Sequence, residues 1–123
     1  MSINVLIADD SGTMRKIIIR SLNAVGITSV TEACDGEQAI GLFKPDTFDL
    51  VLTDWNMPKK SGLDVIKAIR TQDTKVATVM ITTESEKARV IEAIQAGVTD
   101  YLVKPFTPDQ LKEKLEKHVT VPG

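Results

Sequence analysis

The stretch VLIADDSG, residues 5–12, joins a short apolar run to two adjacent carboxylates, Asp9 and Asp10. A short apolar run with β-branched residues is typical of a buried β-strand. The residues that follow have helical spacing, and either Asp10 or Ser11 is suited to cap a helix there. The stretch therefore predicts a strand-to-helix unit whose junction carries two like charges, which requires an explanation.

The same alternation of strand and helix patterns continues along the chain. Strands are expected at INVLIA (3–8), TSVTEA (28–33), DLVLT (49–53), ATVMIT (77–82) and DYLVK (100–104). Four of the helical segments each place apolar residues on one helical face: Met14, Ile18, Leu22 and Val25; Leu63, Ile66 and Ile69; Ala88, Ile91 and Ile94; Leu111 and Leu115. The segment 36–44 has the weakest helical pattern, because Gly41 costs about 1 kcal/mol relative to alanine. Strict alternation predicts one α/β domain over 1–123, a five-stranded parallel sheet with helices on both faces.

Residues suited to helix ends agree with this division. Glycines follow two of the predicted helices, the first and the fourth, as C-caps commonly do, and hydroxyl residues precede the third, fourth and fifth. These expected C-caps are Gly26 and Gly97, and the expected N-caps are Ser61, Ser85 and Thr107, with Pro108 in the first turn of the last helix.

Composition excludes several classes of protein. The chain has 123 residues and a net charge of -2, which does not favour nucleic acid or an anionic membrane as a partner. Neither a signal peptide nor a membrane-spanning segment is expected. The single cysteine, Cys34, permits no internal disulfide, fits a cytoplasmic location and is expected to be a small core residue.

Polar side chains stand at the carboxyl ends of four predicted strands. The first strand ends at Asp9 and Asp10, the third at Asp54, the fourth at Thr82 and the fifth at Lys104. Ligands of open α/β sheets bind at this rim. One acid at a strand end is usually a cap or a solvated loop residue. The indication of function comes from the combined pattern on several strands.

Three carboxylates in one crevice require a cation or raised pKa values. Magnesium prefers such oxygen ligands, whereas zinc prefers histidine and cysteine. His118, in the last helix, is expected to be a surface residue. An aspartate beside a metal, a lysine and a hydroxyl is suited to accept a phosphoryl group. Asp54 is the best nucleophile, with Asp9 and Asp10 left to hold the metal.

Four motifs, which together span most of the chain, resemble one protein family. They are ADDSGTMRK (8–16), LTDWNMPKKSG (52–62), MITTE (80–84) and YLVKPFT (101–107). They are similar to the receiver domain of bacterial two-component response regulators, and most similar to its single-domain chemotaxis members. The resemblance implies a flavodoxin-like fold with strand order 2-1-3-4-5.

The resemblance also implies roles for the residues at the rim. Asp54 would accept a phosphoryl group from a sensor histidine kinase. Asp9, Asp10, Asp54 and the backbone carbonyl of Asn56 would bind Mg²⁺. Lys104 would pair with the phosphate.

Further residues would act as a switch. Thr82 would move to hydrogen-bond the phosphate, and Tyr101 would swing inward and couple the site to the surface of the fourth helix, fifth strand and fifth helix. The Lys104–Pro105 peptide bond would be cis. From the residues alone, a half-buried strand aromatic is the better interpretation of Tyr101.

Three residues bear on the lifetime of the phosphoryl group in this family. They are Asn56, Glu84 and Thr83, although the first two are equally solvated loop residues. Thr83 departs from the family, which usually has alanine there, and a larger side chain would narrow access to Asp54.

The resemblance implies a phosphoacceptor signalling protein and not an enzyme. Its output would be binding of another protein, because the chain has no expected output domain. The partners would be the kinase, a downstream protein such as a flagellar motor switch protein, and a phosphatase, and the chain would be a monomer. A phosphate sink or a phosphorelay shuttle stays open.

Other classes that share parts of this pattern fit less well. A haloacid dehalogenase-type phosphohydrolase would need an acid where Asn56 stands. A flavin carrier needs a glycine- and hydroxyl-rich loop in place of Asp9 and Asp10, and a dinucleotide site needs G-x-G-x-x-G.

Overall fold

The computed structural model describes residues 3–83 and 88–120, and within them strands and helices alternate as expected. The elements are β1 (Asn4–Ala8), α1 (Gly12–Ala24), β2 (Ser29–Ala33), α2 (Gly36–Leu42), β3 (Leu50–Asp54), α3 (Gly62–Arg70), β4 (Ala77–Thr82), α4 (Val90–Ala96), β5 (Asp100–Val103) and α5 (Pro108–Glu116). The strands are parallel and lie in the order β2-β1-β3-β4-β5. The predicted flavodoxin-like, doubly wound fold is confirmed.

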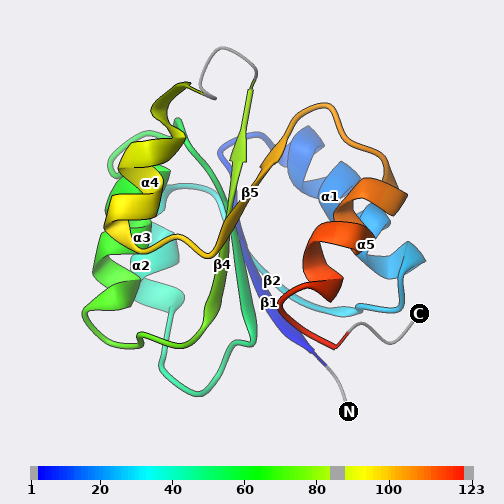
Figure 1. The fold of residues 1–123 in the computed structure, drawn as a ribbon, viewed down its shortest axis with the longest axis horizontal. Helices are drawn as coiled ribbons and strands as arrows, with labels where there is room; N and C mark the ends of the chain where they lie inside the picture. Colours follow the sequence, from blue (N-terminus) through cyan, green and yellow to red (C-terminus); the bar gives the residue numbers. More distant parts are fainter. Residues whose placement is uncertain (1–2, 84–87, 121–123) are drawn as a thin grey trace.

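Helices cover both faces of the sheet. Figure 1 shows α1 and α5 on one face and α2, α3 and α4 on the other. Successive residues of a strand point to opposite faces, so β1 contributes to two separate cores. Val5 and Ile7 belong to the cluster that includes α1 and α5, whereas Leu6 and Ala8 belong to the cluster that includes α2 and α3. This explains why the central strands are apolar without alternation.

A third, smaller cluster lies beneath α3 and α4. Its buried members are Trp55, Ile66, Met80 and Ala93, and Tyr101 is partly buried against it. The cluster thus joins the residue after the end of β3 to α4 and β5.

The helix ends follow the predicted capping residues with small differences. Ser61 and Thr107 form capping boxes, and Pro108 begins α5. Ser11, and not Asp10, caps α1 by accepting a hydrogen bond from the Met14 amide. Gly97 caps α4 in a left-handed conformation, but Gly26 stands one residue beyond the cap of α1, which is Val25. Ser85 lies outside the described residues.

The apolar stripe predicted on the fourth helix is not its buried face. Ile91 and Ile94 are 66% and 59% exposed, whereas Val90 and Ala93 are buried. Spacing shows only that the two isoleucines share a face, and the packing partners decide whether that face is covered. Ala93 is the buried residue that α4 contributes to the third cluster.

Two single-residue expectations need correction. Cys34 is exposed, not a core residue. It follows Ala33, the last residue of the edge strand β2, at a point where the chain leaves the sheet. His118 is half-buried and not simply on the surface, because its Nε2 lies 2.9 Å from Asp100 Oδ2.

Within residues 3–83 and 88–120, no helix combines the length and the apolar character needed to cross a membrane.

Candidate phosphoacceptor and metal site

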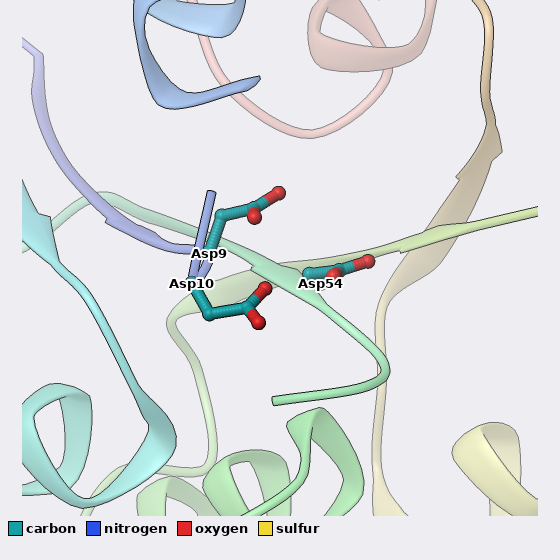
Figure 2. Close-up of side chains that lie close together, drawn as sticks. All are labelled: Asp9, Asp10 and Asp54. Atoms are coloured by element: carbon teal, nitrogen blue, oxygen red, sulfur yellow. The ribbon is translucent and has the colours of Figure 1, made fainter. Parts of the chain in front are cut away.

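The carboxyl ends of β1 and β3 bring three aspartates together. Asp9, Asp10 and Asp54 each offer one carboxylate oxygen, and these oxygens lie within 4.8 Å of one another. Figure 2 shows the three side chains at the two strand ends. Asp9 and Asp54 are buried, whereas Asp10 is exposed. The predicted acidic cluster therefore exists as a geometric unit.

Asp9 is 1% exposed, and among the described residues only one of its two carboxylate oxygens accepts a hydrogen bond. Its Oδ1 accepts a hydrogen bond of 2.8 Å from the Ser11 amide. Its Oδ2 is buried and has no hydrogen-bond partner among the described residues. Burial raises the pKa of Asp9 above the ordinary value, against the opposing hydrogen bond from Ser11. A buried carboxylate oxygen with no donor is suited to bind a cation.

Arg15 fixes the backbone beside this carboxylate. Its Nη1 donates a hydrogen bond of 2.6 Å to the carbonyl oxygen of Asp9, and its Nε donates one of 2.9 Å to Glu32 Oε1. Arg15 lies in the motif ADDSGTMRK, but spacing alone did not indicate that it would contact the carbonyl of Asp9.

Asp54, the last residue of β3, is paired with Lys104. The Lys104 Nζ donates a hydrogen bond of 3.1 Å to Asp54 Oδ1. Burial raises the pKa of Asp54, the hydrogen bond from Lys104 opposes this, and the charge of Asp9 raises the pKa further. One ammonium group thus only partly offsets the cost of holding this carboxylate charged.

A glycine allows the chain after Asp54 to lie close to it. A Cβ at Gly62 would be 2.1 Å from the Asp54 carbonyl oxygen and 2.9 Å from the Met80 sulfur. The Gly62 amide donates a hydrogen bond of 2.8 Å to the Trp55 carbonyl. The first turn of α3 is therefore held directly against the end of β3.

Thr82 ends β4, between Asp54 and Lys104 in the sheet. Its hydroxyl oxygen is buried and has no hydrogen-bond partner among the residues described. Its carbonyl accepts a hydrogen bond of 2.7 Å from the Lys104 amide. The structure thus places an unsatisfied hydroxyl on the strand that separates the carboxylate from the lysine.

The other predicted residues lie around this site. Asn56 is exposed just beyond Asp54, and Thr83 is partly buried just beyond Thr82. Glu84 lies outside the described residues. The Lys104–Pro105 peptide bond is cis, as the resemblance implied.

Tyr101 is partly buried on β5, against the third cluster. The Lys114 Nζ lies 4.9 Å from the centre of its ring and 3.1 Å from Asp100 Oδ1. His118, which was expected to be a surface residue of the last helix, lies beyond the end of α5, contacts this carboxylate and has no part in the acidic cluster. Burial alone would raise the pKa of Asp100, but hydrogen bonds from His118, the Tyr101 amide and Lys114 hold it below the ordinary value.

The donor atoms fit a hard divalent cation. The cluster offers carboxylate oxygens with no sulfur or imidazole among its members, which suits magnesium better than zinc. The free Asp9 Oδ2 and the raised pKa values of Asp9 and Asp54 are both features that a bound cation would relieve.

A parallel sheet with an acidic cluster at its carboxyl edge is the arrangement expected of a receiver domain. Residues 5–116 match the family described as the response regulator receiver domain, and the chain belongs to that family.

Similar proteins carry chemotaxis names. The chain is 44% identical to the chemotaxis protein CheY of Pseudomonas aeruginosa over 115 residues, which cover 92% of this chain and 93% of that protein. It is 48% identical to chemotaxis protein CheY1 of Helicobacter pylori over 114 residues, covering 90% and 92%. The solved structure of chemotaxis protein CheY4 of Vibrio cholerae superposes with a TM-score of 0.87 at 32% identity, covering 97% of this chain and all of that one.

Proposed function

We propose that this protein is a phosphorylation-dependent switch in two-component signalling and that Asp54 is its phosphoacceptor. One observation carries the proposal: a buried carboxylate at a strand end lies 3.1 Å from an ammonium group and beside two further carboxylates. Family membership supports the same role, and the names of the relatives favour chemotaxis as the pathway.

The transfer step uses the Asp54 carboxylate as the nucleophile. An Asp54 oxygen attacks the phosphorus of a phosphohistidine on a sensor histidine kinase. An oxygen–phosphorus bond forms while the nitrogen–phosphorus bond breaks, and the bonding electron pair stays on the imidazole nitrogen, which takes up a proton. Lys104 stabilises the negative charge of the phosphoryl oxygens. Water later hydrolyses the acyl phosphate, which releases inorganic phosphate and restores the Asp54 carboxylate.

Asp9, Asp10, Asp54 and the Asn56 carbonyl would hold Mg²⁺. When bound, the cation supplies positive charge that offsets the three carboxylates and the incoming phosphoryl group. The raised pKa values of Asp9 and Asp54 indicate that these two buried carboxylates are costly to hold charged in its absence.

Thr82 and Tyr101 would carry the signal away from the site. The unsatisfied Thr82 hydroxyl is a donor available for a phosphoryl oxygen. Tyr101 lies one strand further along, against the cluster that contains Trp55. A change at Asp54 would bias the surface of α4, β5 and α5, and a downstream protein that prefers one arrangement would select it. A flagellar motor switch protein is the proposed partner.

Phosphoryl lifetime would depend on residues that follow Asp54 and Thr82 in the sequence. The resemblance implies that Thr83 stands where alanine is usual and that Asn56 and Glu84 tune hydrolysis, although Glu84 lies outside the described residues. A larger side chain at 83 would slow the approach of donor and water alike, and a phosphatase would act on the same aspartyl phosphate.

Labelling tests the proposed role of Asp54. Incubation with Mg²⁺ and acetyl phosphate should add one phosphoryl group, which intact-mass spectrometry would detect, and Asp54→Asn should not be labelled. Asp49→Asn is a matched control, because Asp49 is an exposed acid at the opposite end of β3. Equal labelling of Asp54→Asn and the wild-type protein would refute the assignment.

A pull-down distinguishes a switch from a phosphate sink. The beryllofluoride-bound protein should retain the motor switch protein more strongly than the untreated protein does. Equal retention would instead favour a sink or a shuttle, which shares the same site.

A further inference from the structure

An arginine at the start of α4 lies over the residue that follows the proposed phosphoacceptor. The Arg89 guanidinium carbon is 4.6 Å from the ring centre of Trp55. Trp55 follows Asp54 directly and is 1% exposed, with its ring in the third cluster. Distances up to about 6 Å from the face of tryptophan give a favourable cation–π contact. Arg89 therefore links the end of β3 to the beginning of α4.

Among the described residues, few other contacts hold the first turn of α4. Arg89 occupies the N-cap position but makes no capping hydrogen bond with its side chain. Its side chain is 48% exposed, and Glu92 Oε2 lies 3.4 Å from its Nη2. The buried residues that α4 contributes are Val90 and Ala93, both small. Within the part of the chain that the structure describes, the contact with Trp55 is thus a substantial part of what holds this end.

The other end of α4 is held more firmly by a second arginine. Arg70 Nε donates a hydrogen bond of 2.8 Å to the carbonyl of Gly97, the C-cap. Arg70 Nη2 also donates to the hydroxyl oxygens of Thr78 and Thr99, at 3.1 and 3.2 Å. A set of hydrogen bonds from a part-buried guanidinium resists displacement more than one half-exposed cation–π contact does.

We propose that Arg89 is a positioning residue that holds the first turn of α4 against Trp55 while Asp54 is a free carboxylate paired with Lys104. This proposal rests on the proposed function, because it assumes that Asp54 is modified. Phosphorylation would release the first turn of α4, with the Arg70–Gly97 contact remaining as the pivot. Arg89 would thereby set how strongly phosphorylation of Asp54 is coupled to release of the first turn of α4.

The expected effect follows from the strength of the contact. A cation–π contact at a half-exposed site shifts a two-state equilibrium by about two- to fivefold. Because the contact belongs to the arrangement with a free carboxylate, its removal should favour the modified arrangement. Arg89→Met removes the charge but keeps an unbranched apolar side chain. Arg89→Lys keeps a charge that can approach the ring and should lie between Arg89→Met and the wild-type protein.

The test measures binding of beryllofluoride, a mimic of the aspartyl phosphate, by calorimetry in saturating Mg²⁺. The midpoint, which is the beryllofluoride concentration at half-saturation, should fall about two- to fivefold in Arg89→Met and fall less in Arg89→Lys. It should stay unchanged in Arg20→Met, a control on the exposed surface of α1. A separate readout is Trp55 emission without beryllofluoride, which should change in Arg89→Met and be largely restored in Arg89→Lys. A purely structural role would lower the melting temperature without moving the midpoint.

The outcomes separate this inference from the proposed function. An unchanged or raised midpoint in Arg89→Met, with normal binding by the wild-type protein, would overturn the role of Arg89 alone. If the wild-type protein binds no beryllofluoride and acetyl phosphate does not label Asp54, both proposals fail together. If Arg89→Met does not fold, a double-mutant cycle replaces it, in which Arg89→Lys, Trp55→Phe and the double variant are compared with the wild-type protein. If the effects of the two substitutions on the midpoint simply add, the role of Arg89 is overturned.

Discussion

Lys104 Nζ and Asp54 Oδ1 lie 3.1 Å apart, which joins the carboxyl ends of β5 and β3 across β4. The side chains of both residues are largely buried, with exposures of 19% and 10%. The pair brings one positive charge to a cluster of three carboxylates, and the pKa of Asp54 stays raised in spite of it. The site therefore has an excess of negative charge and favours further positive charge.

Replacing Lys104 should slow phosphorylation of Asp54. Lys104→Met removes the hydrogen bond that lowers the pKa of Asp54 and the charge that would stabilise the phosphoryl oxygens. Loss of one such group typically slows a transfer by about 100- to 1,000-fold. Labelling rates with acetyl phosphate and Mg²⁺ would measure this. Lys114→Met, which alters a lysine paired with Asp100, should keep the wild-type rate. A rate for Lys104→Met within a factor of two of wild type would contradict this role.

Magnesium should raise the melting temperature of the protein. A ligand that binds only the folded state stabilises it by RT ln(1 + [L]/Kd), which is about 2.7 kcal/mol at 100 times Kd. Asp10→Asn removes one ligand, so the same Mg²⁺ concentration should raise its melting temperature less. Asp46→Asn changes an exposed acid outside the cluster and should respond as the wild type does. A melting temperature that does not change up to millimolar Mg²⁺ would argue against the metal site.

The emission of Trp55 should also change on addition of Mg²⁺. Trp55 is the only tryptophan of the chain and follows Asp54 directly. Binding of a cation to the Asp54 carboxylate would alter the charge next to the indole ring. A fluorescence titration would measure the change, which Asp54→Asn should weaken. The absence of any change in the wild-type protein would count against a metal bound at Asp54.

Without Mg²⁺, Asp54→Asn should be more stable than the wild-type protein at neutral pH. Burial raises the pKa of Asp54 above 3.8, so the folded state binds this proton more tightly than the unfolded state does. The charged carboxylate therefore destabilises the fold above the raised pKa, and the cost is relieved as the pH falls towards 3.8. The advantage of Asp54→Asn should shrink over that range.

Urea denaturation in EDTA between pH 8 and pH 4 would measure this dependence. Asp73 provides a control of opposite sign, because the Lys75 amide lowers its pKa. Asp73→Asn should reduce the free energy of unfolding above pH 3.8, where the wild-type carboxylate is charged. An Asp54→Asn protein that is less stable than wild type at neutral pH would show that the pair with Lys104 outweighs burial.

Gly62→Ala should destabilise the protein, whereas Gly41→Ala should not. A methyl group at 62 would lie 2.1 Å from the Asp54 carbonyl oxygen, so the backbone would have to shift. Such overpacking typically lowers the free energy of unfolding by about 1–3 kcal/mol. A methyl group at 41 in α2 meets nothing within 4 Å and should add about 0.5–1 kcal/mol of stability. Equilibrium denaturation of the two variants would measure both. If Gly62→Ala matched the wild type in stability, the close packing of α3 on β3 would be refuted.

The sequence alone was sufficient to predict the fold class and the edge of the sheet at which the acidic cluster lies. Strand and helix periods differ, so their alternation along the chain was readable and predicted a doubly covered parallel sheet. Because parallel strands end at one edge, Asp9, Asp10, Asp54, Thr82 and Lys104 could be assigned to one rim before any distance was known. The resemblance added the strand order, the cis bond before Pro105 and the expected switch residues.

Only the tertiary structure decided which side chains are covered and which are paired. Periodicity groups Ile91 with Ile94 but does not reveal which face has a packing partner, so the exposure of both was not foreseeable. The exposure of Cys34 likewise depends on the edge position of β2. The contacts of Arg89 with Trp55 and of Arg70 with Gly97 join residues far apart in sequence. A long side chain reaches its partner only after the sheet and helices have set the distance between them, and sequence spacing carries no record of that distance.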